Sequence, residues 1–206
     1  MTSNRRAAQS YDTVAADYDE RFRDELDVKP RDRELLAALA TRSSGIVLDV
    51  GSGPGHVGAH IRGFGRPVIA LDLSPAMTRA AARRLDAAVV ADMTSLPIGA
   101  ATIADVVAFY SVIHLPRRVL PEVLSEFARV LAPKGHALLA AHEGTEDVTV
   151  REFLGHDVDL TATLFSLGEL TDAARRAGLA VVSAERRPPY ENEGSTNRLY
   201  LDLEHR

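Results

Sequence analysis

Cysteine is absent from this sequence of 206 residues. A disulfide framework, a thiolate metal site and a cysteine nucleophile are therefore excluded together. The seven histidines are too dispersed along the chain for a metal cluster, so we predict no metal site. Internal repeats, low-complexity segments and linkers are also missing from the sequence, which therefore offers no boundary between domains.

Long apolar runs are missing as well. The first ten residues are polar and basic and lack the apolar core of a signal peptide, and no later run is long enough to cross a membrane. We therefore expect a cytoplasmic protein without a membrane partner. The net charge of -5, with arginine doublets scattered among acids, weighs against a nucleic-acid partner.

Apolar residues make up 46% of the chain, enough for one well-packed core, so we predict a single domain over residues 1–206. Tyr11 and Tyr18 share one face of a predicted helix over Ser10–Phe22, and a second amphipathic helix is predicted over Arg31–Ala40. The opposite face of the first helix is charged. We therefore expect residues 1–42 to form a helical lid or cap over the rest of the domain.

Short apolar runs alternate with helical patterns along the rest of the chain. The segment Val158–Leu164 alternates with polar residues and is expected to be extended before a helix that Ser166 and Glu169 cap. Such alternation predicts a mostly parallel sheet with helices on both faces and ligands at the carboxyl ends of its strands. The predicted strands are Ile46–Leu48, Val68–Leu71, Ala87–Val90, Ile103–Phe109, His136–Ala141, Leu179–Ala184 and Leu199–Leu203.

The stretch Ile46–Gly58, IVLDVGSGPGHVG, carries the clearest functional signal. An apolar strand enters a cluster of glycines before a helix, so the backbone can approach a ligand closely. Asp49 is an unexpected acidic residue in this apolar strand, because burying an acid there costs free energy unless the acid is hydrogen-bonded. We expect Asp49 to order the glycine loop or to reach toward a ligand.

Five segments resemble, in order, the successive motifs of class I S-adenosylmethionine-dependent methyltransferases. They are VLDVGSGPG, ALDLSPAM, ADMTSLPI, AFYSVIHLP and ARVLAPKGHALLA. YDTVAADYDERF resembles the N-terminal helix of that family, and FSLGELTDAARRAGL resembles the helix before its last hairpin. The resemblance implies a Rossmann-like three-layer sandwich whose seven-stranded sheet has the order 3-2-1-4-5-7-6 with the last strand antiparallel. It also implies methyl transfer from S-adenosyl-L-methionine.

The resemblance also assigns contacts to that cofactor. The glycine loop would pass under the methionine part, and Asp72 would accept hydrogen bonds from both ribose hydroxyls. Asp92 would accept one from the adenine amino group, while the Phe109 carbonyl would face the methionine ammonium. The predicted cofactor residues are Tyr11, Tyr18, Asp49, Gly51, Ser52, Gly53, Asp72, Leu73, Met77, Asp92, Met93 and Phe109.

A literal GxGxxG at Gly53–Gly58 raises the alternative of an NAD(P)-dependent oxidoreductase. In that fingerprint the first glycine directly follows the strand, whereas here the strand already ends at Gly51. Counting from Gly51 puts His56 where the third glycine should be, so the methyltransferase pattern fits better. A second alternative is a protein that binds S-adenosylmethionine or S-adenosylhomocysteine without methylation activity, although the intact cofactor motifs weigh against it.

The acceptor side is less well specified. Methyl transfer depends chiefly on in-line positioning and exclusion of water, and His114 is our first candidate for a catalytic base, with a pocket wall as its alternative role. The predicted acceptor residues are Tyr110, Ser111, His142, Glu143 and Tyr190. Without a long insertion for a recognition domain, we expect an oxygen or nitrogen of a small-molecule metabolite to be methylated. The sequence leaves the oligomeric state open.

Overall fold

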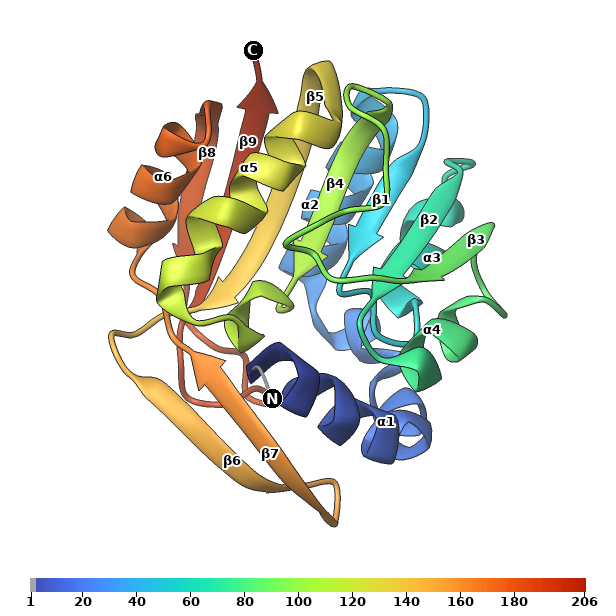
Figure 1. The fold of residues 1–206 in the computed structure, drawn as a ribbon, viewed down its shortest axis with the longest axis vertical. Coiled ribbons are helices and arrows are strands. Elements are labelled where there is room, and N and C mark those ends of the chain that lie inside the picture. Colours follow the sequence, from blue (N-terminus) through green and yellow to red (C-terminus); the bar gives the residue numbers. More distant parts are fainter. Residues whose placement is uncertain (1–2) are drawn as a thin grey trace.

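The computed structural model describes residues 3–206, so the first two residues of the predicted lid lie outside it. The strands of the main sheet are β1 (Val47–Val50), β2 (Val68–Asp72), β3 (Ala87–Val90), β4 (Ile103–Phe109), β5 (Leu131–His142), β8 (Leu179–Arg187) and β9 (Arg198–His205). Their order is β3-β2-β1-β4-β5-β9-β8 (Figure 1). Because β8 and β9 are the sixth and seventh strands of this sheet, the predicted order is confirmed.

Strands β1 to β5 run parallel to one another, and β9 runs antiparallel to both β5 and β8. All four residues of β1 are buried, as expected for a central strand that is covered on both faces. Parallel pairing brings the carboxyl ends of the first five strands to one edge of the sheet. In the view of Figure 1 this edge lies at the bottom.

Helices cover both faces of the sheet, which confirms the predicted three layers. The helices are α1 (Ser3–Phe22), α2 (Pro30–Arg42), α3 (His56–Arg62), α4 (Pro75–Ala81), α5 (Leu120–Val130) and α6 (Leu167–Arg176). One core cluster joins α5 and α6 to the sheet, and a second joins α2 and α3 to the other face. Helix α1 instead crosses the carboxyl edge of the strands (Figure 1).

Capping signals in the sequence set several of these helix boundaries. The Ser74 hydroxyl accepts a hydrogen bond from the Met77 backbone N–H at the start of α4, and Ser166 and Glu169 form the predicted capping box of α6. Helix α4 ends at Ala81. Its last turn tightens to bonds between residues three apart, from the Arg84 N–H to the Ala81 carbonyl.

A two-stranded hairpin stands apart from the main sheet. It consists of β6 (Asp147–Phe153) and β7 (His156–Thr163), joined at Leu154 and Gly155, which both have positive φ. Only the β7 part was predicted to be extended; most β6 side chains are exposed, and the apolar alternation of this strand is confined to Val148 and Val150. This hairpin is therefore a short insertion between β5 and α6, smaller than a separate recognition domain.

A buried ion pair ties together the opposite, amino-terminal edge of the sheet. The Arg66 guanidinium lies 2.8 Å from the Asp105 carboxylate on β4, and their side chains are 5% and 0% exposed. Arg66 also donates hydrogen bonds to the carbonyls of Ser43 and Gly45, which connect α2 to β1. The pair therefore fixes the segment that leads into the glycine loop.

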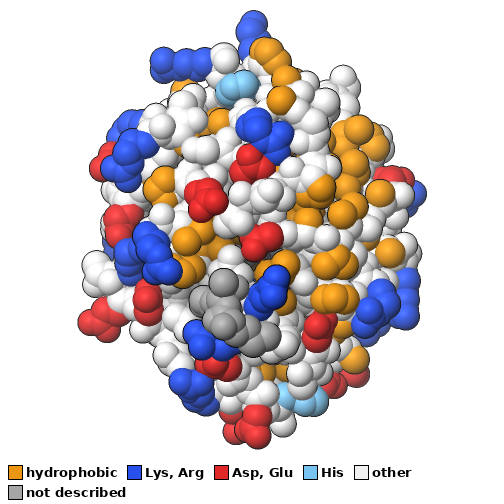
Figure 2. All heavy atoms as spheres, in the orientation of Figure 1, with side chains coloured by type: hydrophobic (Ala, Val, Ile, Leu, Met, Phe, Trp, Pro, Cys, Tyr) orange, Lys and Arg blue, Asp and Glu red, His pale blue; other side chains and the backbone are white. Residues whose placement is uncertain are grey.

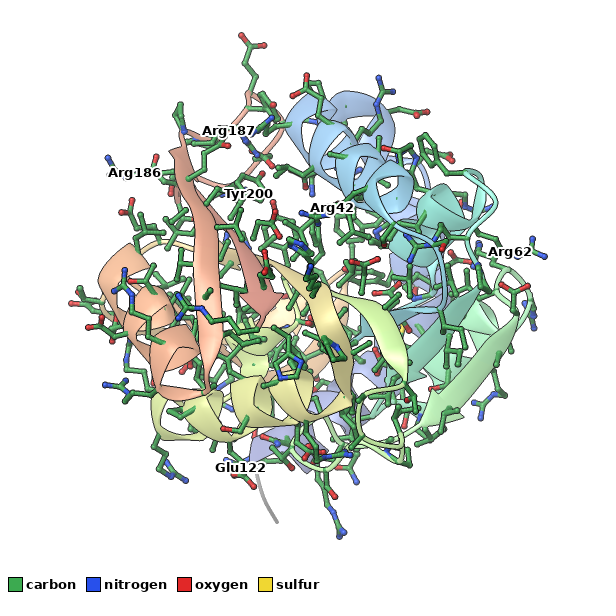
Figure 3. All side chains as sticks on the ribbon, turned by 90° about the horizontal axis from the view of Figure 1, so that it is seen from above. Arg42, Arg62, Glu122, Arg186, Arg187 and Tyr200 are labelled. Atoms are coloured by element: carbon green, nitrogen blue, oxygen red, sulfur yellow. The ribbon has the colours of Figure 1, made fainter. Side chains whose placement is uncertain are left out.

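Removing Arg66 should destabilise the protein strongly, because the buried Asp105 carboxylate would lose its cationic partner and keep only the hydrogen bond from the Ser43 hydroxyl. We expect Arg66→Ala to lower the free energy of unfolding by about 3–5 kcal/mol, measured by urea denaturation. Arg62→Ala is the matched control: Arg62 points into solvent (Figure 3), its pair with Asp86 is 52% and 40% exposed, and its loss should cost less than about 1 kcal/mol. Equal losses in the two variants would contradict this interpretation.

Candidate active site

A cavity lies at the carboxyl edge of the sheet, beneath α1. Including its open mouth, it encloses about 970 Å³. The lining includes every predicted cofactor residue, the predicted base and two of the five predicted acceptor residues. These are Tyr11, Tyr18, Asp49, Gly51, Ser52, Gly53, Asp72, Leu73, Met77, Asp92, Met93, Phe109, Tyr110, Ser111 and His114. The fold thus brings together residues that are spread over a hundred positions of the sequence.

The glycine loop after β1 exposes its backbone to this cavity. Gly51 and Gly53 have φ values of 69° and 54°, a left-handed conformation that favours glycine. A Cβ atom on Gly51 would lie 2.3 Å from the Cβ of Ser111, whereas one on Gly53 would meet nothing closer than the Tyr18 ring at 3.9 Å. The close contact with Ser111 therefore requires glycine at position 51. At Gly53 the missing side chain leaves open space for a ligand.

Asp72, at the end of β2, connects two loops of the cavity wall. Its carboxylate accepts hydrogen bonds from the backbone N–H groups of Gly53 at 2.9 Å and Ser74 at 2.8 Å. Burial raises the pKa of Asp72, and these two bonds oppose that effect by stabilising the ionised form. Each carboxylate oxygen retains further acceptor capacity for a ligand.

Asp49 is 2% exposed, and the structure places it under the first turn of α3. One of its carboxylate oxygens has no hydrogen-bond partner and would lie 2.9 Å from a Cβ atom on Gly58. Burial raises the pKa of Asp49 to about 7, against the opposing effect of the nearby His56. Burial therefore favours the protonated form of this carboxyl.

Asp92 follows β3 and forms one end of the cavity with Met93. Its side chain accepts hydrogen bonds from the Thr94 backbone N–H at 3.0 Å and the Thr94 hydroxyl at 2.9 Å. This local turn holds the carboxylate in a fixed direction. Ala91, the preceding residue, also lines the cavity.

His114 has a defined tautomer in the structure. Its Nδ1 lies 3.2 Å from the Thr161 carbonyl of β7, and its Nε2 lies 2.7 Å from the Tyr11 hydroxyl. A carbonyl can only accept, so Nδ1 carries the hydrogen and the Nε2 lone pair accepts from Tyr11. Burial lowers the pKa of His114, so the ring is neutral at pH 7. A neutral imidazole with an available lone pair is suited to act as a base.

Tyr110 forms a wall of the cavity with its ring, while its hydroxyl points into a buried polar network. That hydroxyl donates to Asp32 on α2, which also accepts a hydrogen bond from Tyr200. Arg187 donates to Tyr200 and pairs with Glu193, and Arg187 and Tyr200 lie next to each other in Figure 3. Tyr110 has a φ of 53°, a costly conformation for a residue with a large side chain, and the network holds it there.

Three predicted acceptor residues lie outside the cavity. His142 stands behind Tyr110, with the ring centroids 5.1 Å apart, and hydrogen-bonds to Thr196. Glu143 is held at the surface by Arg186 at 2.6 Å and by Asn197. These two side chains are occupied by neighbours in the closing hairpin, so the prediction that they line the acceptor pocket needs correction.

Tyr190 is displaced for the same reason. The Arg187 guanidinium stacks on its ring at 3.8 Å from the centroid, and its hydroxyl accepts a hydrogen bond from the Arg31 backbone N–H. The loop between β8 and β9 therefore folds back against α2 and does not reach the cavity.

Two titratable residues of the cavity, Glu25 and His56, were not predicted from the sequence as site residues. Oε1 of Glu25 lies 2.8 Å from Nε2 of His56. His56 directly follows the glycine loop, a position that could have identified it. Glu25 lies in a short 3-10 helix between α1 and α2, where no motif draws attention to it. Among residues 3–206, no cluster of three or more potential metal ligands occurs, and no helix is long and apolar enough to cross a membrane.

Comparison with known proteins identifies the type of domain that contains this cavity. Residues 47–135 match a family model described as a methyltransferase domain. In fold, the chain is similar to an S-adenosylmethionine-dependent methyltransferase from Leishmania major, with a TM-score of 0.75, 14% identity, and coverage of 97% of this chain and 82% of that one. Residues 47–135 are thus similar to a methyltransferase domain, and the chain has the class I methyltransferase fold.

Two further relatives of this methyltransferase domain are informative. An uncharacterized methyltransferase from Geobacillus kaustophilus is 27% identical over 65% of this chain, and the aligned part of the chain spans 62% of that relative's length. The 1,6-didemethyltoxoflavin-N1-methyltransferase of Burkholderia thailandensis, solved with its substrate and S-adenosylhomocysteine, has a TM-score of 0.72 and 19% identity. That comparison covers 100% of this chain and 91% of the other.

Proposed function

We propose that this protein is an S-adenosylmethionine-dependent methyltransferase that acts on an oxygen or nitrogen of a small-molecule metabolite. One observation carries the proposal: the open glycine loop, Asp72 and Asp92 line one cavity at the ends of neighbouring strands. This order matches the methionine, ribose and adenine parts of the cofactor. The methyltransferase-domain match supports the same conclusion.

A small acceptor fits the cavity beneath α1 better than a macromolecule does. Tyr11, Tyr18 and Tyr110 supply aromatic surface, and His114 supplies a hydrogen-bond acceptor among them. Similar folds include enzymes solved with 1,6-didemethyltoxoflavin and with geranyl diphosphate. Acidic and basic side chains are interspersed on the face shown in Figure 2, in keeping with the predicted absence of a nucleic-acid partner. A cytoplasmic location also remains a prediction from the sequence.

Cofactor identity is tested by thermal unfolding. S-adenosylhomocysteine should raise the Tm in line with its affinity, and NAD or NADP should not. Asp72→Ala should weaken S-adenosylhomocysteine binding by about 1.5–3 kcal/mol, the range for hydrogen bonds to a charged group. Stabilisation by a dinucleotide alone would favour the oxidoreductase alternative. Binding without formation of S-adenosylhomocysteine from S-adenosylmethionine, across a screen of small hydroxyl and amine compounds, would favour the non-catalytic alternative.

His114 is the proposed base, acting through Nε2 when the acceptor hydroxyl or amine replaces the hydroxyl of Tyr11. His114→Gln should lower the maximal methylation rate by about 10²–10⁴-fold while S-adenosylhomocysteine affinity stays near normal. The wild-type rate should rise with pH through an apparent pKa below the ordinary histidine value of 6.5, because burial lowers the pKa and only the neutral ring accepts a proton. A smaller loss, or one caused by weaker cofactor binding, would leave His114 as a wall residue.

Helix α1 is the proposed lid, whereas α2, the rest of the predicted cap over residues 1–42, packs against one face of the sheet through Leu36 and Leu39. Asp12 accepts hydrogen bonds from the Ser74 hydroxyl and the Ala76 N–H, and Asp19 pairs with Arg84 at 2.8 Å. These polar contacts hold α1 over the cavity. Hydrogen bonds to water can replace them when the helix moves away. Hydrogen exchange should show α1 protected by S-adenosylhomocysteine far more than the central strands are. Equal protection with and without ligand would indicate a fixed structural helix.

A further inference from the structure

Glu25 lies at one end of the cavity and has no role in the site described so far. Its side chain is 16% exposed, and it belongs to the short helix Glu25–Val28 between α1 and α2. One carboxylate oxygen lies 2.8 Å from Nε2 of His56, and the other lies 2.6 Å from Nζ of Lys29. Two donors from different elements therefore hold this carboxylate in one orientation.

The surroundings keep Glu25 ionised. Burial raises the pKa of Glu25, but the hydrogen bond with His56 and the charge of Lys29 lower it to about 2. Lys29 itself lies over the Tyr110 ring, with Nζ 5.1 Å from the centroid, and does not line the cavity. The residues that do line it, within the part of the chain the structure describes, include no lysine or arginine. Glu25 therefore presents a negative charge to any ligand at this end.

The strand order places Glu25 relative to the proposed cofactor. The strands β3, β2, β1 and β4 end side by side along the sheet edge. Asp92 follows β3 and Asp72 ends β2, so the proposed cofactor runs along this edge from its adenine at β3 to its ribose at β2. The remaining part of the ligand, its amino-acid end, then lies over β1 and β4.

The position of Tyr18 agrees with this direction. Burial raises the pKa of the Tyr18 hydroxyl, and the charges of Tyr11, Glu25 and Asp72 raise it further. Tyr18 therefore lies within electrostatic reach of both Glu25 and Asp72. Glu25 itself is held between His56, which follows β1 and the glycine loop, and Lys29, whose Nζ lies over the ring of Tyr110 after β4, so Glu25 lies beside the ends of β1 and β4 and away from Asp92.

We propose that Glu25 binds the α-ammonium group of the amino-acid part of S-adenosylmethionine and so selects ligands that carry this group. This role rests on the proposed function. A primary ammonium in a partly desolvated site requires an anionic or strongly polar acceptor, and an ionised, fixed carboxylate supplies it. Asp49, the other acid near this end, lies under α3, and its burial disfavours the ionised form that an ammonium needs. Lys29 and His56 are positioning residues that orient the Glu25 carboxylate.

Calorimetry with three ligands tests the assignment. S-adenosylhomocysteine carries the ammonium, its deamino analogue has a hydrogen in that place, and 5′-methylthioadenosine lacks the amino-acid part altogether. The wild type should bind S-adenosylhomocysteine about 10- to 100-fold more tightly than the deamino analogue. Glu25→Gln should remove most of that difference by weakening S-adenosylhomocysteine alone, with the other two ligands changed less than about twofold.

Glu20→Gln is the matched control, because it removes the same charge from an exposed position on α1 and should change none of the three affinities. Equal wild-type affinity for S-adenosylhomocysteine and its deamino analogue would overturn the role of Glu25, and this comparison needs no variant to fold. Equal weakening of all three ligands by Glu25→Gln would also overturn it, because the residue would then only shape the cavity. Failure of the wild type to bind any of the three would instead refute the proposed function on which the role rests.

Discussion

The close approach of the glycine loop to the segment after β4 is the constraint on which the site depends. At Gly51 the two backbones are so near that a Cβ atom would lie 2.3 Å from the Cβ of Ser111. The Gly51 and Ser52 N–H groups both donate to the Leu71 carbonyl, which fixes the loop to β2. The loop, the end of β2 and the segment after β4 therefore form one rigid wall, and the other cavity residues take their positions from it.

The charge of the cavity follows from what this wall buries. Glu25, Asp49, Asp72 and Asp92 all line it, and the lining residues that the structure describes include no lysine or arginine. Backbone N–H groups, a histidine and a lysine behind the wall stabilise these acids, while burial raises the pKa of Asp49 and Asp72. A site of this kind favours a ligand with positive charge, and S-adenosylmethionine carries a sulfonium and an ammonium. The proposed cofactor thus complements the electrostatics as well as the shape.

Much of this arrangement could be predicted from the sequence because local signals and the global fold agree. Apolar runs identified the strands of the main sheet, and Ser166 and Glu169 identified the start of α6. The hairpin strand β6 was missed because most of its side chains are exposed and its apolar alternation is confined to Val148 and Val150. Its partner β7, which was predicted to be extended, supplies the Thr161 carbonyl that sets the tautomer of His114, a contact that the sequence pattern does not show.

The errors in the predicted acceptor pocket have a common origin. Topology places the loop between β8 and β9 near the ligand edge, but it does not show which side chains find partners within that loop. Arg187 pairs with Glu193 and stacks on Tyr190, and Arg186 holds Glu143. Glu25 was missed for the opposite reason: no motif marks it, and only the packing of a short helix beside α3 brings it to the cavity. Neither the pairs that hold Glu143 and Tyr190 away from the cavity nor the contact that brings Glu25 to it can be predicted from the sequence pattern, so both are known only from the structure.

A crystal structure of the complex with S-adenosylhomocysteine would test the account of the cavity most directly. The account predicts the adenine beside Asp92 and Met93, the ribose hydroxyls on Asp72, and the amino-acid end over the glycine loop with its ammonium at Glu25. A ligand bound outside the cavity, or one lying in the reverse direction with its amino-acid end at Asp92, would contradict it.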